Sequence, residues 1–209
     1  MQRARRWWKA LGAAAAMAVL VSVVVVSGSA QARQQEKEID FKMVRSAAAT
    51  NANCLPKASA DVEVESLGPV EKMKVRAQGL PPNTEFDFFV TQVPNAPFGL
   101  SWYQGDIETD SHGRGTGKFV GRFNTETFIV APDSAPAPVV HGPDASSNPA
   151  TGPVHTFHLG LWFNSPADAA AAGCPNTVTP FNGDHNAGIQ VLSTRNFAND
   201  QGPLRQLTP

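Results

Sequence analysis

Apolar and polar residues alternate in short runs along most of this chain, and Gly, Pro or Asn separate the runs. A period of two places every second side chain on the same face of an extended strand. Many short strands between turn residues predict an all-β fold, an antiparallel sandwich or barrel. The runs that carry this pattern are 39–44, 61–67, 72–77, 85–92, 102–109, 117–123, 127–130, 154–163 and 187–194.

One short helix is predicted at residues 165–173. Ser165 is a good N-cap, Pro166 suits the first turn, and Asp168 lies three residues after the cap. The four alanines that follow are strong helix formers, and Gly173 can adopt the left-handed conformation that ends a helix. The helix would position Cys174, the residue that follows it.

The N-terminus has the three parts of a cleavable signal peptide. Four basic residues lie within the first nine, an apolar run covers 10–26, and the small-x-small triplet Ala-Gln-Ala stands at 30–32. We expect cleavage before Arg33 and a secreted, extracellular protein. The alternative is an uncleaved anchor, because the apolar run is about as long as the shortest membrane-spanning helix, ~17 residues. The alanine-rich signal resembles those of small exported proteins of bacteria, of an actinobacterial type.

Cleavage would leave 177 residues with 13 basic and 18 acidic side chains, a formal net charge of −5. That balance argues against a nucleic-acid partner, which requires a concentrated positive field. No later run is apolar enough to span a bilayer, so we expect no membrane association after cleavage. Cys54 and Cys174 both remain, and an even count in an oxidising compartment predicts a disulfide between them.

Domain boundaries follow from composition. Residues 33–38 are polar and are predicted to be a disordered stub. Residues 131–153 contain six prolines and many small residues, which is typical of a linker or a long loop. The part beyond this segment has too few apolar residues to fold alone. We therefore predict one domain, 39–209, with a long exposed Pro-rich loop at 131–153.

Residues 80–88, Leu-Pro-Pro-Asn-Thr-Glu-Phe-Asp-Phe, carry the most specific local pattern. They resemble the "L-x-P-x-T-x-Y" corner of fibronectin type III and related immunoglobulin-like domains. The resemblance implies an immunoglobulin-like sandwich whose chain crosses between sheets at this corner. Phe86 stands where that family has tyrosine, so the hydroxyl hydrogen bond of the tyrosine corner cannot form.

Residues 105–117 predict a strand, a tight turn and a returning strand. Asp110 can cap the turn, and the glycines at 113 and 115 can supply positive φ angles. The alternative is a calcium site that uses Asp106, Glu108 and Asp110, but their spacing is not that of a known calcium loop.

A metal site could form from His158, Asp184 and His185, provided that their strands are neighbours. His155 and His158 cannot share an ion on a regular strand, because residues three apart point to opposite faces. Ordinary histidines at strand edges are the alternative.

Three large aromatic residues, Trp102, Tyr103 and Trp162, form a possible ligand platform for a sugar or a peptide. Alternation along 154–163 places Phe157, Leu159, Leu161 and Phe163 towards the core and leaves Trp162 on the outer face. Burial of the three aromatic residues in the core is the alternative.

No catalytic motif or phosphate-binding loop is present in the sequence, and we predict no cofactor. The pattern favours a secreted, disulfide-stabilised binding or structural module without an evident catalytic site, with an extracellular protein or glycan as its partner. The alternatives are a secreted hydrolase or metal-dependent enzyme on a β-sandwich scaffold, and a protease inhibitor that presents the loop at 131–153.

Overall fold

The computed structural model describes residues 37–123, 127–129, 138–142, 153–180 and 185–207. The predicted signal peptide and residues 33–36 of the predicted stub lie outside the described residues. Glu38, the last residue of that stub, is instead the first residue of a strand. The described residues belong to one compact unit. Within them, no helix has the length and apolar character needed to cross a membrane.

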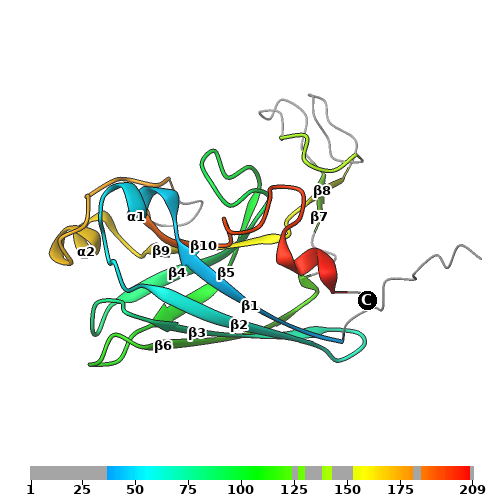
Figure 1. Ribbon diagram of the computed structural model, residues 1–209, viewed down its shortest axis with the longest axis horizontal. Coiled ribbons are helices and arrows are strands. Elements are labelled where there is room, and N and C mark those ends of the chain that lie inside the picture. The colour runs from blue at the N-terminus through cyan, green and yellow to red at the C-terminus, as the bar shows by residue number, and fades with distance from the viewer. Residues whose placement is uncertain (1–36, 124–126, 130–137, 143–152, 181–184, 208–209) are drawn as a thin grey trace, which may run out of the picture. The chain divides into compact units, whose positions relative to one another are not determined.

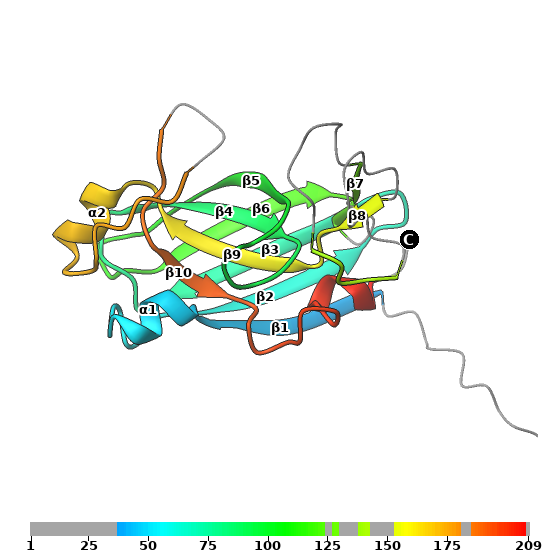
Figure 2. The ribbon, with the colours of Figure 1, turned by 90° about the horizontal axis from the view of Figure 1, so that it is seen from above.

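Eight strands of the described chain form an antiparallel sheet in the order β5-β4-β9-β10-β1-β2-β3-β6. Strands β10 and β1 share two residue pairs, Val44 with Ser193 and Arg45 with Leu192. This short junction divides the sheet into two halves, sheet I and sheet II, which lie over one another as layers (Figures 1 and 2). Sheet I contains β1 (Glu38–Arg45), β2 (Ser59–Ser66), β3 (Glu71–Gln78) and β6 (Gly115–Gly121); sheet II contains β4 (Glu85–Thr91), β5 (Ser101–Glu108), β9 (His158–Phe163) and β10 (Gln190–Ser193).

The predicted all-β, antiparallel, sandwich-like fold is confirmed by this arrangement. The predicted strand at 154–163 is split in two. The backbone of Gly202 packs closely against Phe157 at the break, where a Cβ on Gly202 would lie 2.4 Å from the Phe157 carbonyl oxygen. The first part, β8 (Pro153–His155), pairs with β7 (Thr127–Ile129) in a separate ribbon. Most of the predicted loop at 131–153 lies outside the described residues.

The space between the layers holds the inward residues that the alternation selects. On β3, Met73 and Val75 are fully buried, whereas Lys72 lies on the outer side. Phe86 of β4 packs against Phe163 of β9 with ring centroids 4.9 Å apart. Each fully buried side chain of this size contributes about 1.5–3 kcal/mol. The largest of them are Met43, Met73, Phe86, Phe88, Ile107, Phe123, Leu159, Leu161, Phe163, Leu192 and Leu204.

The chain crosses between the sheets at the corner that the 80–88 pattern implied. Strand β3 ends in sheet I, and β4 begins in sheet II. A second crossing, from β5 to β6, packs against the first. The Thr84 amide donates to Thr109 Oγ1 (2.9 Å), and the Thr109 amide donates to the Thr84 carbonyl (2.9 Å). The two crossings therefore brace each other.

The tight turn predicted within 105–117 is present, but its two strands do not return alongside each other. Asp110 Oδ1 accepts hydrogen bonds from the amides of His112 (2.8 Å) and Arg114 (3.0 Å). A single bridge, Thr109 with Gly115, joins the two sides. Strand β6 then pairs along its whole length with β3, so β5 and β6 lie in different sheets. Turn chemistry fixes the turn but not the partner of the strand that follows.

Two short helices lie near the junction of the sheets. Helix α2 (Pro166–Ala171) confirms the prediction, with Ser165 Oγ accepting from the Asp168 amide (3.1 Å). Helix α1 (Ala47–Asn51) was not predicted from the sequence. Ser46 caps it by accepting from the Ala49 amide (2.9 Å), and its hydroxyl donates to the Gln190 carbonyl of β10 (2.6 Å).

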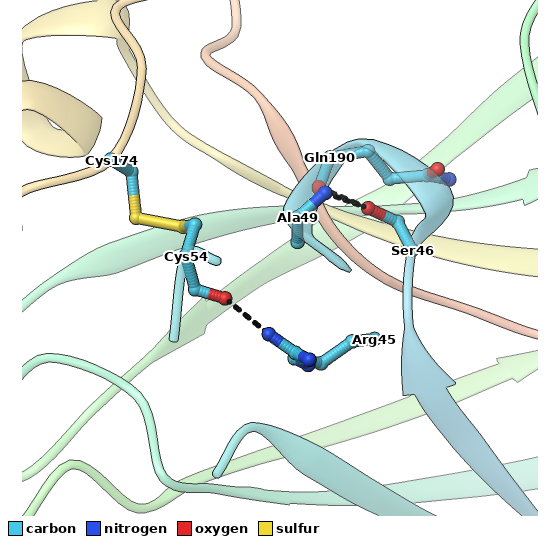
Figure 3. Close-up of a disulfide and its surroundings, with 6 residues drawn as sticks. All are labelled: Arg45, Ser46, Ala49, Cys54, Cys174 and Gln190. Carbon is cyan, nitrogen blue, oxygen red and sulfur yellow. Dashed lines mark hydrogen bonds between the residues drawn. A yellow bond between two sulfur atoms is a disulfide. The ribbon is translucent and has the colours of Figure 1, made fainter. Parts of the chain in front are cut away.

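The predicted disulfide between Cys54 and Cys174 is confirmed, with a Cα–Cα separation of 5.1 Å. Each cysteine follows one helix, and its amide donates to a helix carbonyl, that of Ala49 or Ala169. Figure 3 shows the bridge beside α1, where Arg45 Nη1 also donates to the Cys54 carbonyl (3.2 Å). The bridge links the end of sheet I to the end of sheet II over 120 residues of sequence.

Candidate functional site

The outer face of sheet II is unlike an ordinary solvent-facing β-surface. Alternation along β4 directs Asp87, Phe89 and Thr91 outwards, since Phe88 and Val90 face the core. Register places Trp162 of β9 opposite Asp87 and His158 opposite Thr91. Asp87, Thr91 and His158 are nevertheless fully buried, and Trp162 is only 3% exposed. A layer of polar and aromatic side chains therefore lies on this face beneath other parts of the chain.

Two β-bulges shape this face. Between β4 and β5, Phe88 pairs with Gly105 and Phe89 pairs with Tyr103, so Gln104 is an extra residue. The bulge brings Tyr103 to the same side as Asp106, and the Tyr103 hydroxyl donates to Asp106 Oδ1 (2.5 Å).

The second bulge lies between β9 and β10. Gln190 pairs with Trp162 and Leu192 pairs with Leu161, so Val191 is the extra residue. Gln190 and Ser193 consequently both lie on the outer face, although they are three residues apart. Bulges that redirect side chains in this way are frequent next to binding and active sites.

Four aromatic rings form a row on this face, which we call the aromatic row. Phe89 lies in its centre, 5.5 Å from Tyr103 and 5.3 Å from Trp162 between ring centroids. Phe98, from the segment that follows β4, packs edge-on against Trp162 at 5.0 Å. The outer ring of Trp162 lies over Gly160, where a Cβ would come within 2.2 Å of the indole. Glycine at this position therefore allows Trp162 to lie close to the sheet.

Asp87 is the buried carboxylate of the face. His185 lies beside it, with Nε2 3.7 Å from Asp87 Oδ2, too far for a direct hydrogen bond, and the two form an ion pair when the imidazole is protonated. Burial raises the pKa of Asp87 to about 6, and the neighbouring Asp106 carboxylate raises it as well, while His185 lowers it. A carboxylate with this environment is typical of binding and active sites.

Several polar atoms of the face, including those of Asp87, are buried and have no hydrogen-bond partner in the described structure. Such a group costs about 1–3 kcal/mol of stability, and native proteins contain few of them. Register places all of them on the outer side: Gln190 is opposite Trp162, and Ser193 is opposite Gly160. The atoms are both carboxylate oxygens of Asp87, Trp162 Nε1, Gln190 Nε2, Thr91 Oγ1 and Ser193 Oγ.

Further carboxylates lie towards β5. Glu85 pairs with Glu108 and Asp87 pairs with Asp106, so four acidic residues stand on neighbouring outward positions. The pKa of Glu85 is raised, chiefly by burial and then by Asp106 and Glu108. Asp106, Glu108 and Tyr103 are exposed. The solvent exposure of the face therefore decreases from β5 towards β4 and β9.

His158, one of the predicted metal ligands, is engaged within the fold. Its Nδ1 lies 2.9 Å from Thr194 Oγ1, which already accepts from the Leu159 amide and so can donate to the ring. Its Nε2 lies 3.2 Å from the Asn199 carbonyl and is therefore the protonated nitrogen. Burial lowers the pKa of His158 to about 4. His158 thus anchors the backbone at Asn199; the 3-10 helix η2 (Pro203–Gln206) follows, and its Leu204 packs in the hydrophobic core.

The predicted ligand sets are brought together only in part. His185 lies beside Asp87 and His158 lies opposite Thr91, four residues further along β4. Asp184 lies outside the described residues. Among the described residues, no group of three or more His, Cys, Asp or Glu is placed to hold a metal ion. The metal site stays a prediction.

Two of the three predicted platform residues share the face. Tyr103 and Trp162 both belong to the aromatic row, joined through Phe89. Trp102 pairs with Val90, so it lies on the opposite side of β5, where it is 53% exposed. Sequence reasoning missed Asp87, Phe89, Phe98 and Gln190. The available signal was a carboxylate between two phenylalanines in the middle of a strand, Phe86-Asp87-Phe88.

A groove of about 450 Å³ lies beside the segments that cover this face. Its walls come from three stretches: 93–97, which precedes Phe98, 138–140, and Asn199 with Asp200. The 92–100 segment is held in place by Gln92, whose Nε2 donates to the Pro138 carbonyl (2.6 Å).

No family model and no curated protein matches this chain.

Proposed function

We propose that the protein is an exported, disulfide-stabilised binding module that holds a small organic ligand on the outer face of sheet II. The observation that carries the proposal is the set of unpartnered, buried polar atoms around Asp87, Trp162 and Gln190. These atoms lie beside the aromatic row. Binding sites combine apolar and aromatic walls with a few polar groups that orient the ligand, and this face has both parts.

A purely structural role explains this face less well. Polar side chains that serve only folding are satisfied by one another or by water, because an unpartnered buried group destabilises the fold. A ligand that supplies donors and acceptors at these positions recovers that free energy on binding. The role of Asp87, Trp162 and Gln190 is therefore proposed to be recognition.

Export is part of the proposal and rests on the signal pattern at 1–32 together with the disulfide, which suits an oxidising compartment. N-terminal sequencing of the exported protein should begin at or near Arg33. Recovery of a protein that begins at Met1 or Gln2 would instead make it a tethered binding module.

A second candidate is a secreted enzyme in which Asp87 acts as a general base. The supporting observation is the burial of Asp87 opposite Asp106, which raises the pKa of Asp87 to about 6, so that the carboxylate could accept a proton near neutral pH. The two candidates differ in the fate of the ligand. A binding module releases it unchanged, whereas an enzyme releases a product, and mass spectrometry of the released molecule distinguishes them.

The test is a thermal-shift screen of the exported protein with small sugars, amino acids and amines. A ligand that binds the folded state raises the melting temperature. The expected result is a compound that stabilises the wild type but not Asp87→Asn or Trp162→Phe. Asp61→Asn, which changes an exposed carboxylate of sheet I beside Lys42, is the matched control. Equal shifts in all variants would place the ligand elsewhere and reject the proposal.

A further inference from the structure

We infer that the ligand carries a cationic nitrogen, an ammonium group on a small organic molecule, which Asp87 and the aromatic row bind together. The inference rests on the proposed function and adds the chemical class of the ligand. Three observations lead to it: the sign of the charges, the nature of the walls, and the long ion pair between Asp87 and His185.

The charges of the face favour a cation. Asp87 lies opposite Asp106, and Glu85 lies opposite Glu108 on the same side of β4 and β5. After burial, the pKa of Glu85 is raised most by the charges of Asp106 and Glu108, whereas the strongest charge acting on Asp87 is that of His185, which lowers its pKa, followed by Asp106 and Glu85, which raise it. An anionic ligand would meet like charges here, whereas an ammonium group would relieve their mutual repulsion.

The walls favour an organic cation. Phe89 is two residues from Asp87 on the same face of β4, and Trp162 is directly opposite Asp87 on β9. The faces of aromatic rings attract ammonium groups within about 6 Å of the ring centroid, and more strongly where water is excluded. A metal ion requires several oxygen or nitrogen ligands, and no sufficient group of such side chains is found among the described residues.

The ion pair that Asp87 makes within the protein is weak in geometry. His185 Nε2 lies 3.7 Å from Oδ2, and the His185 side chain is 37% exposed. A charge-assisted N–H···O bond is typically about 2.7–2.9 Å long. An ammonium donor can therefore make a shorter bond to Asp87 than His185 does. Neither carboxylate oxygen accepts a hydrogen bond from a described residue, so both are available to such a donor.

The gradient of exposure across the face agrees with this assignment. Tyr103 and Asp106 are exposed at the β5 side and are hydrogen-bonded to each other, whereas Asp87 and Trp162 are buried. A ligand that approaches from β5 meets Asp106, Glu108 and the ring of Tyr103 before it reaches Asp87 and Trp162. The cationic end would lie at Asp87 and the apolar part against Phe89 and Trp162.

The test compares four probes of similar size: n-butylammonium, choline, n-butanol and butyrate. Their affinities for the exported protein are measured by calorimetry at about pH 7.5, where a carboxyl of pKa about 6 is mostly ionised. We expect at least one ammonium probe to bind at least about tenfold more tightly than butanol and butyrate. Asp87→Asn should remove that preference, and Trp162→Leu should weaken choline more than n-butylammonium. Asp61→Asn should leave all affinities unchanged.

The outcomes separate this inference from the proposed function. Butanol or butyrate binding as tightly as the ammonium probes, with loss of binding in Asp87→Asn, would keep the site and overturn the cationic ligand. Ammonium binding that is equal in wild type and Asp87→Asn would overturn the inference as well. No binding by any of the four probes would count against both.

Discussion

The outer faces of the two sheets use charged residues in opposite ways. On sheet I, acidic residues of β2 stand opposite basic residues of β3, as Asp61 does to Arg76 and Glu63 to Lys74. Arg76 Nη2 donates to Glu63 Oε2 (2.8 Å), and Lys42 pairs with Asp61. These groups are partly or fully exposed and satisfy one another. On sheet II, Asp87 is buried and no described residue donates a hydrogen bond to it.

The backbones of the two sheets differ as well, because sheet I pairs regularly where sheet II contains bulges. Strands β2 and β3 pair over eight residues in unbroken register, whereas the β4–β5 and β9–β10 pairs each contain a bulge. A regular ladder with paired charges is what folding alone favours. Sheet II departs from it in backbone and in side chains, which agrees with the binding role proposed for this face.

Loss of the disulfide should have the largest effect. Cys54→Ala with Cys174→Ala is expected to lower the free energy of unfolding by about 2–5 kcal/mol, because the bridge closes a long loop. The loss of local stability should be greater in sheet II, since Ser46, which caps the helix before Cys54, donates to the Gln190 carbonyl of β10. Urea unfolding measures the total, and hydrogen exchange should show earlier opening of β10 than of β2. Equal opening of both strands would contradict this difference between the sheets.

The pH dependence of stability should separate two buried groups of sheet II. The pKa of His158 is lowered to about 4, so its contribution is present above pH 6.5 and is lost as the pH falls towards 4. The pKa of Asp87 is raised to about 6, so its contribution is present below pH 4 and is lost as the pH rises through 6. As the pH falls, the stability lost through His158 and the stability gained through Asp87 therefore partly cancel. When the pH falls from 7 to 5, the wild type gains stability from protonation of Asp87, and Asp87→Asn does not. The change in the free energy of unfolding over this range, measured with urea, should therefore be about 1 kcal/mol less favourable for Asp87→Asn than for wild type.

Gly160→Val should disturb sheet II by displacing Trp162, whose indole lies over the glycine. We expect a loss of about 1–3 kcal/mol, the usual cost of overpacking, and a red shift of tryptophan fluorescence as the ring becomes exposed. Thr116→Val, at an exposed position of β6 in sheet I, is the control for a valine substitution on an outer face that leaves Trp162 in place. Equal behaviour of both variants would show that Trp162 is not held by this contact.

Glu63→Gln on sheet I should have the smallest effect. The pKa of Glu63 is lowered, first by its hydrogen bond from Arg76, but the pair is exposed and such pairs contribute little. Thermal unfolding should stay close to that of wild type, and the remaining difference should disappear in about 1 M NaCl. A large, salt-independent loss would mean that sheet I also depends on a specific polar contact.

Much of the fold could be predicted from local sequence, because it follows from period-two alternation and turn residues. The runs at 39–44, 61–67 and 72–77 correspond to β1, β2 and β3. The Cys54–Cys174 pairing followed from there being two cysteines. Helix α1 was missed because it is only five residues long, and the partner of β6 was missed because local sequence does not encode which distant strand pairs with which.

The candidate site could be predicted only in part. Alternation correctly placed Trp162 on the outer face, but strict alternation would put Tyr103 and Asp106 on opposite sides. The extra residue Gln104 reverses that expectation, and nothing in the local sequence marks it as a bulge. The burial of Asp87 depends on segments distant in sequence, so local sequence could not predict it.

The most direct test of the account is the free energy of unfolding of Asp87→Asn at about pH 8, measured with urea beside wild type and Asp61→Asn. A buried carboxylate with a pKa of about 6 lowers stability when it is ionised, so its replacement should make the protein about 1–3 kcal/mol more stable. Asp61→Asn should stay within about 0.5 kcal/mol of wild type. An Asp87→Asn protein that is no more stable than wild type would contradict the claim that Asp87 is kept for binding at the expense of folding.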